Sequence, residues 1–195
     1  MPDPSPHSRA GNAMGRTRSA ALDGARRVLG EVGLRKATMS EVAVRGGLAK
    51  ATLYNHFRTK DDLVSGLLGA EVADLGADCR DLAAGDLAVA LTRAADGVAG
   101  HVVLAGLRGV EPAALLGATS PGAGARWDLI RDEVSLILGA AGRSDEPEPV
   151  DLVCRWLASH VISPGTSDSR AAQARMIAWA LPMAVRMTSF AEPSA

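Results

Sequence analysis

Two short helical patterns on either side of a glycine pair constrain the fold of this 195-residue chain more than any other feature. Thr38-Met39-Ser40-Glu41 has the form of a capping box, in which Thr38 accepts a bond from the N–H of Glu41 and Glu41 returns it. It predicts a helix through Arg45, which Gly46-Gly47 ends, and a second short helix is predicted over residues 50–57. Short helix, tight turn and short helix together predict a helix-turn-helix.

Longer helical patterns surround this motif and predict an all-α fold. Apolar residues recur at intervals of 3, 4 and 3 from Leu22 to Val32, which predicts a helix over 18–32 that Gly33 ends. Gly, Pro and Ser divide the remaining chain into helices predicted over 59–77, 86–107, 111–117, 123–140, 149–162 and 169–190. Aromatic residues make up only 3% of the chain, which favours close-packed helices over strands.

Several features restrict where the protein works. No uncharged apolar run approaches the roughly 18 to 20 residues that cross a bilayer, so we expect no membrane partner. Residues 1–16 are rich in Pro, Ser and Gly and lack the apolar stretch of a secretory signal, so we expect a flexible arm on a cytoplasmic protein. Cys79 and Cys154 have no metal-ligand spacing, and we expect reduced, buried thiols with neither metal nor cofactor.

The net charge of −1 conceals an uneven distribution. Residues 1–63 contain 11 Lys and Arg against 6 Asp and Glu, a net charge of +5. Residues 64–195 contain 10 against 16, a net charge of −6. A basic first third favours contact with a polyanion there, with a chance scatter of solvated charges as the alternative.

The second short helix has two different faces. Leu53 and Phe57 lie four residues apart and, with Leu48, form the face predicted to pack inward. The other face carries small and polar side chains, including the only tyrosine of the chain: Lys50, Ala51, Thr52, Tyr54, Asn55, His56 and Arg58. Exposed groups of these kinds bond phosphates and base edges, so this face is the predicted DNA-reading surface.

Two lysines strengthen this interpretation. Lys50 and Lys60 both lie in the first turn of a predicted helix, where a positive charge opposes the helix dipole by about 0.3 to 1 kcal/mol. A phosphate docked at the same helix end would remove the conflict. The alternative is that each ammonium group only extends into water.

A nearly continuous set of motif positions extends from Val42 to Leu63: Val42-Ala43-x-x-Gly46-Gly47-Leu48-x-Lys50-Ala51-Thr52-Leu53-Tyr54-Asn55-His56-Phe57-Arg58-Thr59-Lys60-Asp61-Asp62-Leu63. This segment resembles the TetR family of transcriptional regulators, and the resemblance covers residues 22–68. It implies phosphate contacts from Thr38, Tyr54, His56 and Lys60. It implies base contacts in the major groove from Ser40, Lys50, Ala51, Thr52 and Asn55. Where the family commonly has Ser before the recognition helix this chain has Ala49, which cannot cap it.

The last two predicted helices are apolar over more than one face. A helix of this kind usually buries one side on its own domain and the other on a partner. We therefore expect a homodimer whose interface includes Val153, Trp156, Leu157, Met176, Trp179 and Met183.

The resemblance also implies a variable helical C-terminal domain that holds a small effector, whose binding changes the spacing of two DNA-binding units. The aliphatic stretch over 86–140 is compatible with an apolar pocket that contains a few orienting groups. The candidates are His101, Arg108, Trp127 and Arg131. Core packing for His101 and Trp127, and a solvated helix face for Arg131, are the alternatives.

The chain is thus predicted to consist of a flexible arm over 1–16, a three-helix helix-turn-helix DNA-binding domain over 17–63, and a larger helical effector-binding and dimerisation domain over 64–195. Arg9, Arg16 and Arg18 would lie at or near the arm, where they reach a minor groove or merely solubilise it. We expect a ligand-responsive repressor that binds a palindromic, double-stranded operator and a small apolar effector. One alternative is a DNA-binding regulator whose C-terminal domain only dimerises or docks a protein and binds no small-molecule effector. The other is an enzyme, which no phosphate loop, nucleophile elbow or acid–base cluster supports.

Overall fold

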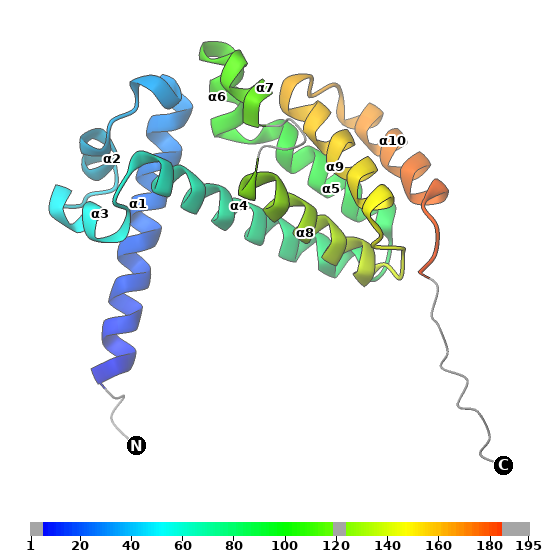
Figure 1. Cartoon of the computed structure of the whole chain (residues 1–195), viewed down its shortest axis with the longest axis horizontal. Coiled ribbons are helices and arrows are strands. Elements are labelled where there is room, and N and C mark those ends of the chain that lie inside the picture. The colour runs from blue at the N-terminus through cyan, green and yellow to red at the C-terminus, as the bar shows by residue number, and fades with distance from the viewer. Residues whose placement is uncertain (1–5, 119–123, 185–195) are drawn as a thin grey trace.

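The computed structural model describes residues 6–118 and 124–184, which form ten helices. They are α1 (Pro6–Lys36), α2 (Met39–Arg45), α3 (Lys50–His56), α4 (Lys60–Ala83), α5 (Leu87–Gly100), α6 (Val102–Val110), α7 (Pro112–Ala118), α8 (Ala125–Ala140), α9 (Pro147–Ile162) and α10 (Ser167–Ala180). The predicted all-α fold is confirmed. Figure 1 shows α1–α3 gathered at one end of the molecule, α5 and α8–α10 at the other, and α4 running from one group to the other. We name α1–α3 the head and α4–α10 the body.

A capping box begins α2, as predicted, and a second one begins α4. Thr38 Oγ1 accepts from the N–H of Glu41 (3.2 Å), and Glu41 Oε2 accepts from the N–H of Thr38 (3.0 Å). Thr59 and Asp62 form the same reciprocal pair at the start of α4, with both distances at 3.0 Å. Since each box satisfies N–H groups that a helix start leaves free, it fixes where the helix begins. α3 begins at Ala49 without a side-chain cap.

The head is closed by direct backbone contact between α1 and α2. A Cβ atom on Gly24 would lie 2.5 Å from the carbonyl oxygen of Val42, and one on Gly46 would lie 2.6 Å from that of Ala20. Only glycine permits this approach. The close crossing lets α2 and α3 pack over a small core in which Leu53 and its neighbours are buried.

Two hydrophobic clusters lie along the molecule. One contains Cys79, Leu91, Leu138 and Val153 and joins α4, α5, α8 and α9 within the body. The other contains the buried residues of the head, together with Val103, Leu107, Leu115 and Val161 from α6, α7 and α9. The core of the head is therefore completed by side chains of the body.

α1 and α6 cross without intervening side chains. A Cβ atom on Gly106 would lie 2.0 Å from the carbonyl oxygen of Gly30. One turn further on, α1 is kinked at Gly33 (φ 80°), and the N–H of Arg35 donates to Glu111 Oε1 (2.8 Å), just after α6. Head and body are thus joined at a backbone contact and a buried carboxylate.

The two ends of the described chain differ from the predictions. α1 begins at Pro6 rather than near residue 18, so residues 6–16 belong to a helix and not to a flexible arm, while residues 1–5 lie outside the described residues. Proline suits the first helical position, where its missing N–H is not needed. The last helix ends at Ala180, because Pro182 restricts Leu181 to an extended conformation (ψ 133°). Residues 185–190 of that predicted helix lie outside the described residues.

The helix predicted over 86–107 is two helices. α5 ends at Gly100, and α6 begins at Val102 at an angle of 46° to it. His101 lies between them with extended backbone (ψ 123°), and its Nδ1 accepts from the N–H of Leu104 (3.5 Å). A histidine that caps the second helix therefore makes the bend. Among the described residues no single helix is long and apolar enough to cross a membrane, and only this bent pair reaches that length and hydropathy together.

Candidate DNA-binding surface and ligand cavity

The outer face of α3 is polar and accessible. Lys50, Ala51, Tyr54 and Asn55 are exposed, whereas Thr52 and His56 on the flanks are half-buried. Tyr54 is 40% exposed, and Lys50 Nζ lies 6.0 Å from the centre of its ring. Within the described part of the chain the hydroxyl, amide and imidazole groups of this face have no hydrogen-bond partner. Unpaired groups on an accessible helix are what contacts to bases and phosphates require.

α2 exposes two further side chains near the turn. Ser40 is exposed, as the prediction of base contact requires. Val44, one turn further along α2, is 77% exposed, although it is an apolar residue on a short helix. An exposed aliphatic group can contact the methyl group of thymine. Val44 was not among the predicted residues, although its four-residue spacing from Ser40 puts it on the same side of α2.

Thr38 has less freedom than the resemblance implies. Its N–H and its hydroxyl both point to Glu41 Oε2, at 3.0 and 2.7 Å. Both donors of Thr38 are therefore engaged in the capping box. A phosphate at Thr38 would have to displace the Glu41 carboxylate from them.

Lys60 has partners inside the protein that the sequence did not indicate. Its ammonium group donates to the carbonyl oxygens of Leu34 (2.6 Å) and Ala37 (3.2 Å) at the end of α1 and is half-buried there. The last carbonyl groups of a helix attract a cation, so Lys60 has favourable partners inside the protein. These two carbonyl groups offset the unfavourable position of the Lys60 charge at the start of α4, so no external anion is needed to explain it.

The arginines predicted near the N-terminal arm have different surroundings. Arg18 stacks over the ring of Phe57, with its guanidinium carbon 5.2 Å from the ring centre, and so lies against the head. Arg16 is exposed on α1. The side chain of Arg9 lies outside the described residues.

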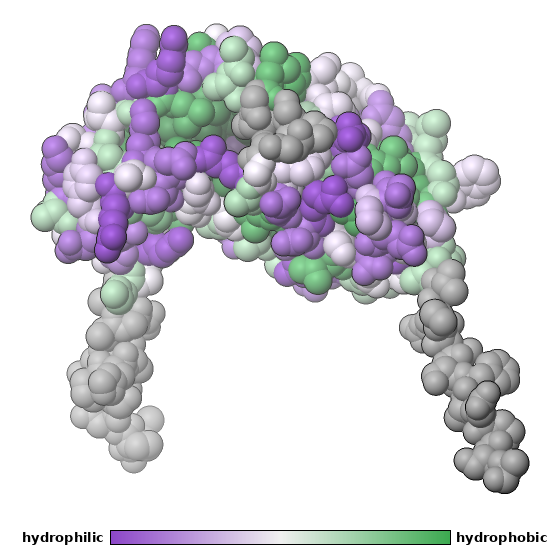
Figure 2. All heavy atoms as spheres, in the orientation of Figure 1, coloured by the Kyte–Doolittle hydropathy of each residue, from purple (hydrophilic) through white to green (hydrophobic). Residues whose placement is uncertain are grey.

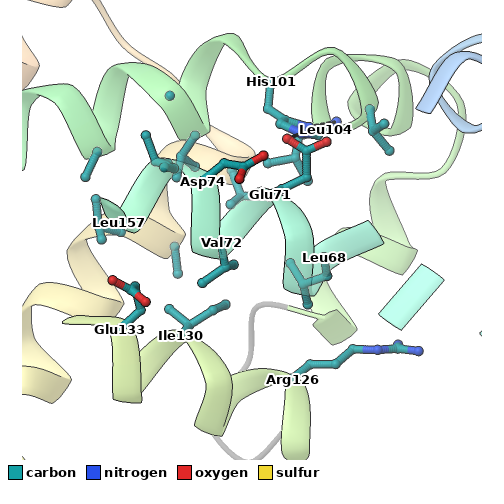
Figure 3. Close-up of a pocket in the computed structure, with 18 of the residues that line it drawn as sticks. Leu68, Glu71, Val72, Asp74, His101, Leu104, Arg126, Ile130, Glu133 and Leu157 are labelled. Carbon is teal, nitrogen blue, oxygen red and sulfur yellow. Dashed lines mark hydrogen bonds and ion pairs between the residues drawn. The ribbon is translucent and has the colours of Figure 1, made fainter. Parts of the chain in front are cut away.

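A cavity of about 790 Å³ lies behind the head. Its wall is mostly aliphatic and comes from α1 and from α4 to α9, with residues such as Leu29, Leu68, Val72, Val98, Leu115, Ile130 and Leu157. Figure 3 shows Glu71, Asp74 and His101 gathered on one side of this space and Glu133 on another. Figure 2 shows hydrophobic residues in several places among the hydrophilic ones on the visible face of the molecule. An apolar cavity of this size with a few polar groups is typical of a small-molecule site.

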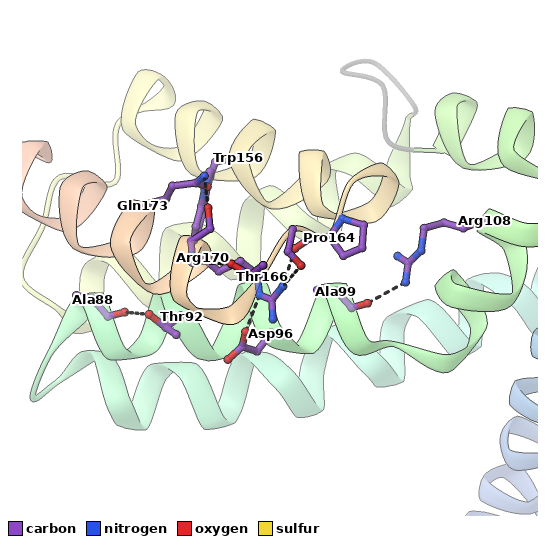
Figure 4. Close-up of polar contacts among 12 residues, drawn as sticks. Ala88, Thr92, Asp96, Ala99, Arg108, Trp156, Pro164, Thr166, Arg170 and Gln173 are labelled. Carbon is purple, nitrogen blue, oxygen red and sulfur yellow. Dashed lines mark hydrogen bonds and ion pairs between the residues drawn. The ribbon is translucent and has the colours of Figure 1, made fainter.

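Two of the four predicted effector residues line the cavity. His101 and Trp127 belong to its wall, but Arg108 and Arg131 do not. Arg108 donates to the carbonyl oxygens of Val161 (3.0 Å) and Ala99 (2.8 Å), the second of which is drawn in Figure 4. Arg108 therefore joins α6 to α5 and α9 instead of facing a ligand.

Arg131 lies outside the cavity as well, since it pairs with Asp151 at 3.6 Å between α8 and α9. Glu71 and Asp74, which were not among the predicted residues, are the acidic members of the cavity wall nearest His101. They lie three residues apart on α4, so both reach the same side. The signal was an acidic pair within the apolar pattern of α4.

Both cysteines also belong to the cavity wall. Cys79 and Cys154 are free thiols with no exposed surface, which confirms the prediction of reduced, buried cysteines. Burial raises the pKa of each thiol to about 11. Both thiols are therefore protonated near neutral pH and behave as small apolar groups. The described residues contain no group of three side chains suited to a metal ion.

The last two helices leave an apolar surface exposed. Trp179 is 87% exposed, Met176 69% and Leu152 49%. Trp156 is half-buried, and its indole N–H donates to Gln173 Oε1 at 2.7 Å (Figure 4). These side chains from α9 and α10 form a surface that we name the α9–α10 face.

Three of the predicted interface residues lie elsewhere. Val153 and Leu157 are buried in the core of the body, because they lie on the opposite side of α9 from Leu152. Met183 is 62% exposed, but it follows Pro182 in an extended segment that bridges to Arg143. Val153 and Leu157, whose apolar character suggested an interface, are therefore core residues of the body.

The architecture and these surfaces were compared with known proteins. A family model described as bacterial regulatory proteins, tetR family, matches residues 21–67, which run from α1 through the helix-turn-helix into α4. The DNA-binding domain of this chain is that of a TetR-family regulator. Members of this family are transcription regulators, so the enzyme alternative is set aside.

Solved structures share the fold of this regulator over most of its length. AlkX, a TetR family repressor from Dietzia sp. strain DQ12-45-1b implicated in biodegradation of n-alkanes, superposes with a TM-score of 0.63 and 18% identity over 83% of this chain and 92% of its own. A structure described as the molecular basis for control of antibiotic production by a bacterial hormone superposes with a TM-score of 0.53 and 20% identity over 85% and 97%. A comparison with curated proteins gave no match.

Proposed function

We propose that this TetR-family regulator is a homodimeric, ligand-responsive repressor that binds a near-palindromic operator in the cytoplasm. The observation that carries the proposal is the combination of an accessible, unpaired polar face on α3 with an apolar cavity that reaches α1 of the same head. Lys50, Ala51, Thr52 and Asn55 would read bases together with Ser40, and Tyr54 and His56 would contact phosphates. Repression is proposed by analogy with AlkX, whose fold this chain shares.

The α9–α10 face supports dimerisation. Trp179 and Met176 expose most of their surface, and large exposed apolar side chains that adjoin one another mark interaction sites. A second copy of the same face would bury both side chains and place two heads on one DNA duplex. Two-fold symmetry then explains why the operator should be near-palindromic.

The cavity supports a small, largely apolar effector. Its wall offers aliphatic contact over a volume within the range of small-molecule sites. Such a ligand would release the operator only to the extent that it binds the non-binding spacing of the heads more tightly.

Selection of bound sequences from a random DNA pool tests the proposal. We expect enrichment of a sequence with two inverted half-sites, centred about one helical turn or somewhat more apart. Trp179→Ala is the matched variant, because it removes the most exposed side chain of the α9–α10 face and leaves the head unchanged. It should weaken binding to the full site far more than binding to a single half-site. Enrichment of single half-sites by the unaltered protein would contradict the dimer.

The second candidate function gives the body only dimerisation or protein docking, and a thermal-shift screen with uncharged lipophilic compounds separates it from the first. A ligand that binds only the folded protein raises its melting temperature. Val72→Trp would fill the cavity from α4 and abolish such a shift. Val89→Trp is the matched control, since Val89 is 48% exposed on α5 and lies outside the cavity wall. Equal shifts in both variants would place the ligand elsewhere.

A further inference from the structure

One carboxylate in the wall of the cavity is held from two sides by residues of different parts of the molecule. Glu71, on α4, accepts through Oε1 from Arg26 Nε (2.6 Å), and its Oε2 lies 3.3 Å from His101 Nε2. Arg26 belongs to α1 of the head, and His101 forms the bend between α5 and α6. The three residues make a continuous polar chain from the head to that bend.

The ring of His101 uses both of its nitrogens. Nδ1 accepts from the N–H of Leu104 and thereby caps α6. Nε2, the other ring nitrogen, lies 3.3 Å from Glu71 Oε2. The same ring therefore fixes the start of α6 and the position of the Glu71 carboxylate.

The chain of contacts lies where a ligand would meet it. Glu71, His101 and Leu104 all belong to the cavity wall, and Figure 3 shows the first two directed toward each other. The Arg26, Glu71 and His101 side chains are 33%, 24% and 22% exposed, so solvent only partly screens them. A polar group of a ligand in the cavity could thus replace either partner of the His101–Glu71 contact.

Loss of the Glu71 contact would leave no stranded charge on the head. Arg26 also pairs with Asp23 on its own helix, at 2.5 Å. When Glu71 turns away, the guanidinium keeps this second partner, which lowers the cost of separating head from body. The link can therefore open without unfolding α1.

We propose that Arg26, Glu71 and His101 form the polar link that fixes the head relative to the cavity, so that a ligand contacting His101 or Glu71 loosens the head. This inference rests on the proposed function of the cavity as an effector site. A loosened head has more conformations to lose on binding DNA, and operator affinity falls accordingly.

Two replacements of His101 separate its two roles. His101→Asn keeps an acceptor close to the backbone and retains the cap of α6, but it is too short to reach Glu71. His101→Gln reaches toward Glu71 with an amide N–H. Against the operator selected from the random pool, we expect His101→Asn to weaken binding roughly threefold to tenfold and His101→Gln to lose less than about twofold.

Glu71→Gln is the second variant, and it keeps the test open should a His101 variant fold poorly. We expect a similar loss of operator affinity, because the neutral amide no longer holds Arg26. Asp151→Asn is the matched control: it neutralises a carboxylate paired with Arg131 and Arg155, away from the cavity wall. It should leave affinity unchanged.

A double-mutant cycle between Arg26→Met and His101→Asn decides whether the effects share one path. Arg26 and His101 are connected only through Glu71. We therefore expect the operator affinity of the double variant to be about the same as that of whichever single variant has the lower affinity. Multiplied losses, or equal affinities for His101→Asn and His101→Gln, would overturn the link while the unaltered protein still binds its operator. Failure of the unaltered protein to select any operator would overturn the proposed function, and the link with it.

Discussion

The DNA-binding surface and the cavity are built in opposite ways. The reading surface comes from Ser40 to His56 on two adjacent short helices, and the capping boxes at Thr38 and Thr59 bracket it. The wall of the cavity extends from Leu29 to Val161 and takes residues from seven helices. A site made from one stretch of chain depends on local signals, whereas a site made from many helices depends on how all of them pack. The two regions should therefore respond differently to substitution.

The largest expected difference is in stability. Leu53→Ala should lower the free energy of unfolding by roughly 2 to 5 kcal/mol, because Leu53 has no exposed surface and is packed on all sides in the head. Leu157→Ala should cost less, since Leu157 borders the cavity and already lacks contacts on that side. Urea unfolding of the two variants measures both values. Equal losses would mean that the cavity wall is as tightly packed as the head.

The next effect concerns recognition. Asn55→Ala should cost about 1 to 3 kcal/mol of discrimination between the selected operator and a variant base pair, because an amide bonds base edges. Asn55 is exposed and has no hydrogen-bond partner among the described residues. The melting temperature of the Asn55→Ala variant should therefore equal that of the unaltered protein. Fluorescence anisotropy with the two duplexes provides the measurement. A lower melting temperature together with unaltered discrimination would assign Asn55 to the fold.

Lys60 lies between the two kinds of role. Lys60→Met should lower the free energy of unfolding by about 1 kcal/mol, because the carbonyl groups of Leu34 and Ala37 lose their donor. The slope of log K against log salt for operator binding should change by less than about 1. A phosphate contact from each subunit of a dimer would instead reduce that slope by about 2. The salt titration therefore distinguishes the internal role from the one implied by the family resemblance.

A smaller effect should follow pH. His160 is buried in the body beneath Trp156, and desolvation lowers its pKa below the usual value, while Arg170 also lowers it and the Ser163 backbone opposes the shift. The unfolded chain then binds a proton to His160 before the folded protein does. Stability should accordingly fall as pH drops below about 6.5 toward the lowered pKa.

Melting curves between pH 5 and 8 check this expectation. His160→Gln keeps much of the volume of the ring without a group that titrates in this range, and its melting temperature should vary less with pH. If the melting temperatures of the unaltered protein and of His160→Gln depend on pH in the same way, a group other than His160 causes that dependence.

Much of the head could be predicted from sequence. The capping box at Thr38, the glycine pair and the inward positions of Leu53 and Phe57 are local patterns, and the structure has each of them where the sequence indicated. The internal partners of Lys60, at the end of α1, were not predicted, because only the packing of the head brings them near. A residue's position on its own helix did not reveal that contact.

The body was less predictable for the same physical reason. Arg108 was predicted for the effector site and Val153 for the dimer interface from their residue types. Local periodicity, however, does not show which neighbouring helix a side chain faces. The bend at His101 was also missed, because a histidine is a weak sequence signal for a helix start. Only the assembled helices show that this residue faces Glu71 and the cavity.

α4 gives the two regions a common mechanical element. Its 24 residues extend about 36 Å. The helix begins at the capping box beside the reading surface, lines the cavity as far as Cys79, and ends at Ala83. A rotation of about 5° around the cavity end would carry the other end through about 3 Å, close to the ~3.4 Å that separates successive base pairs. A side-chain movement too small to disturb the core of the body would therefore be enough to shift a head by about one step along the DNA.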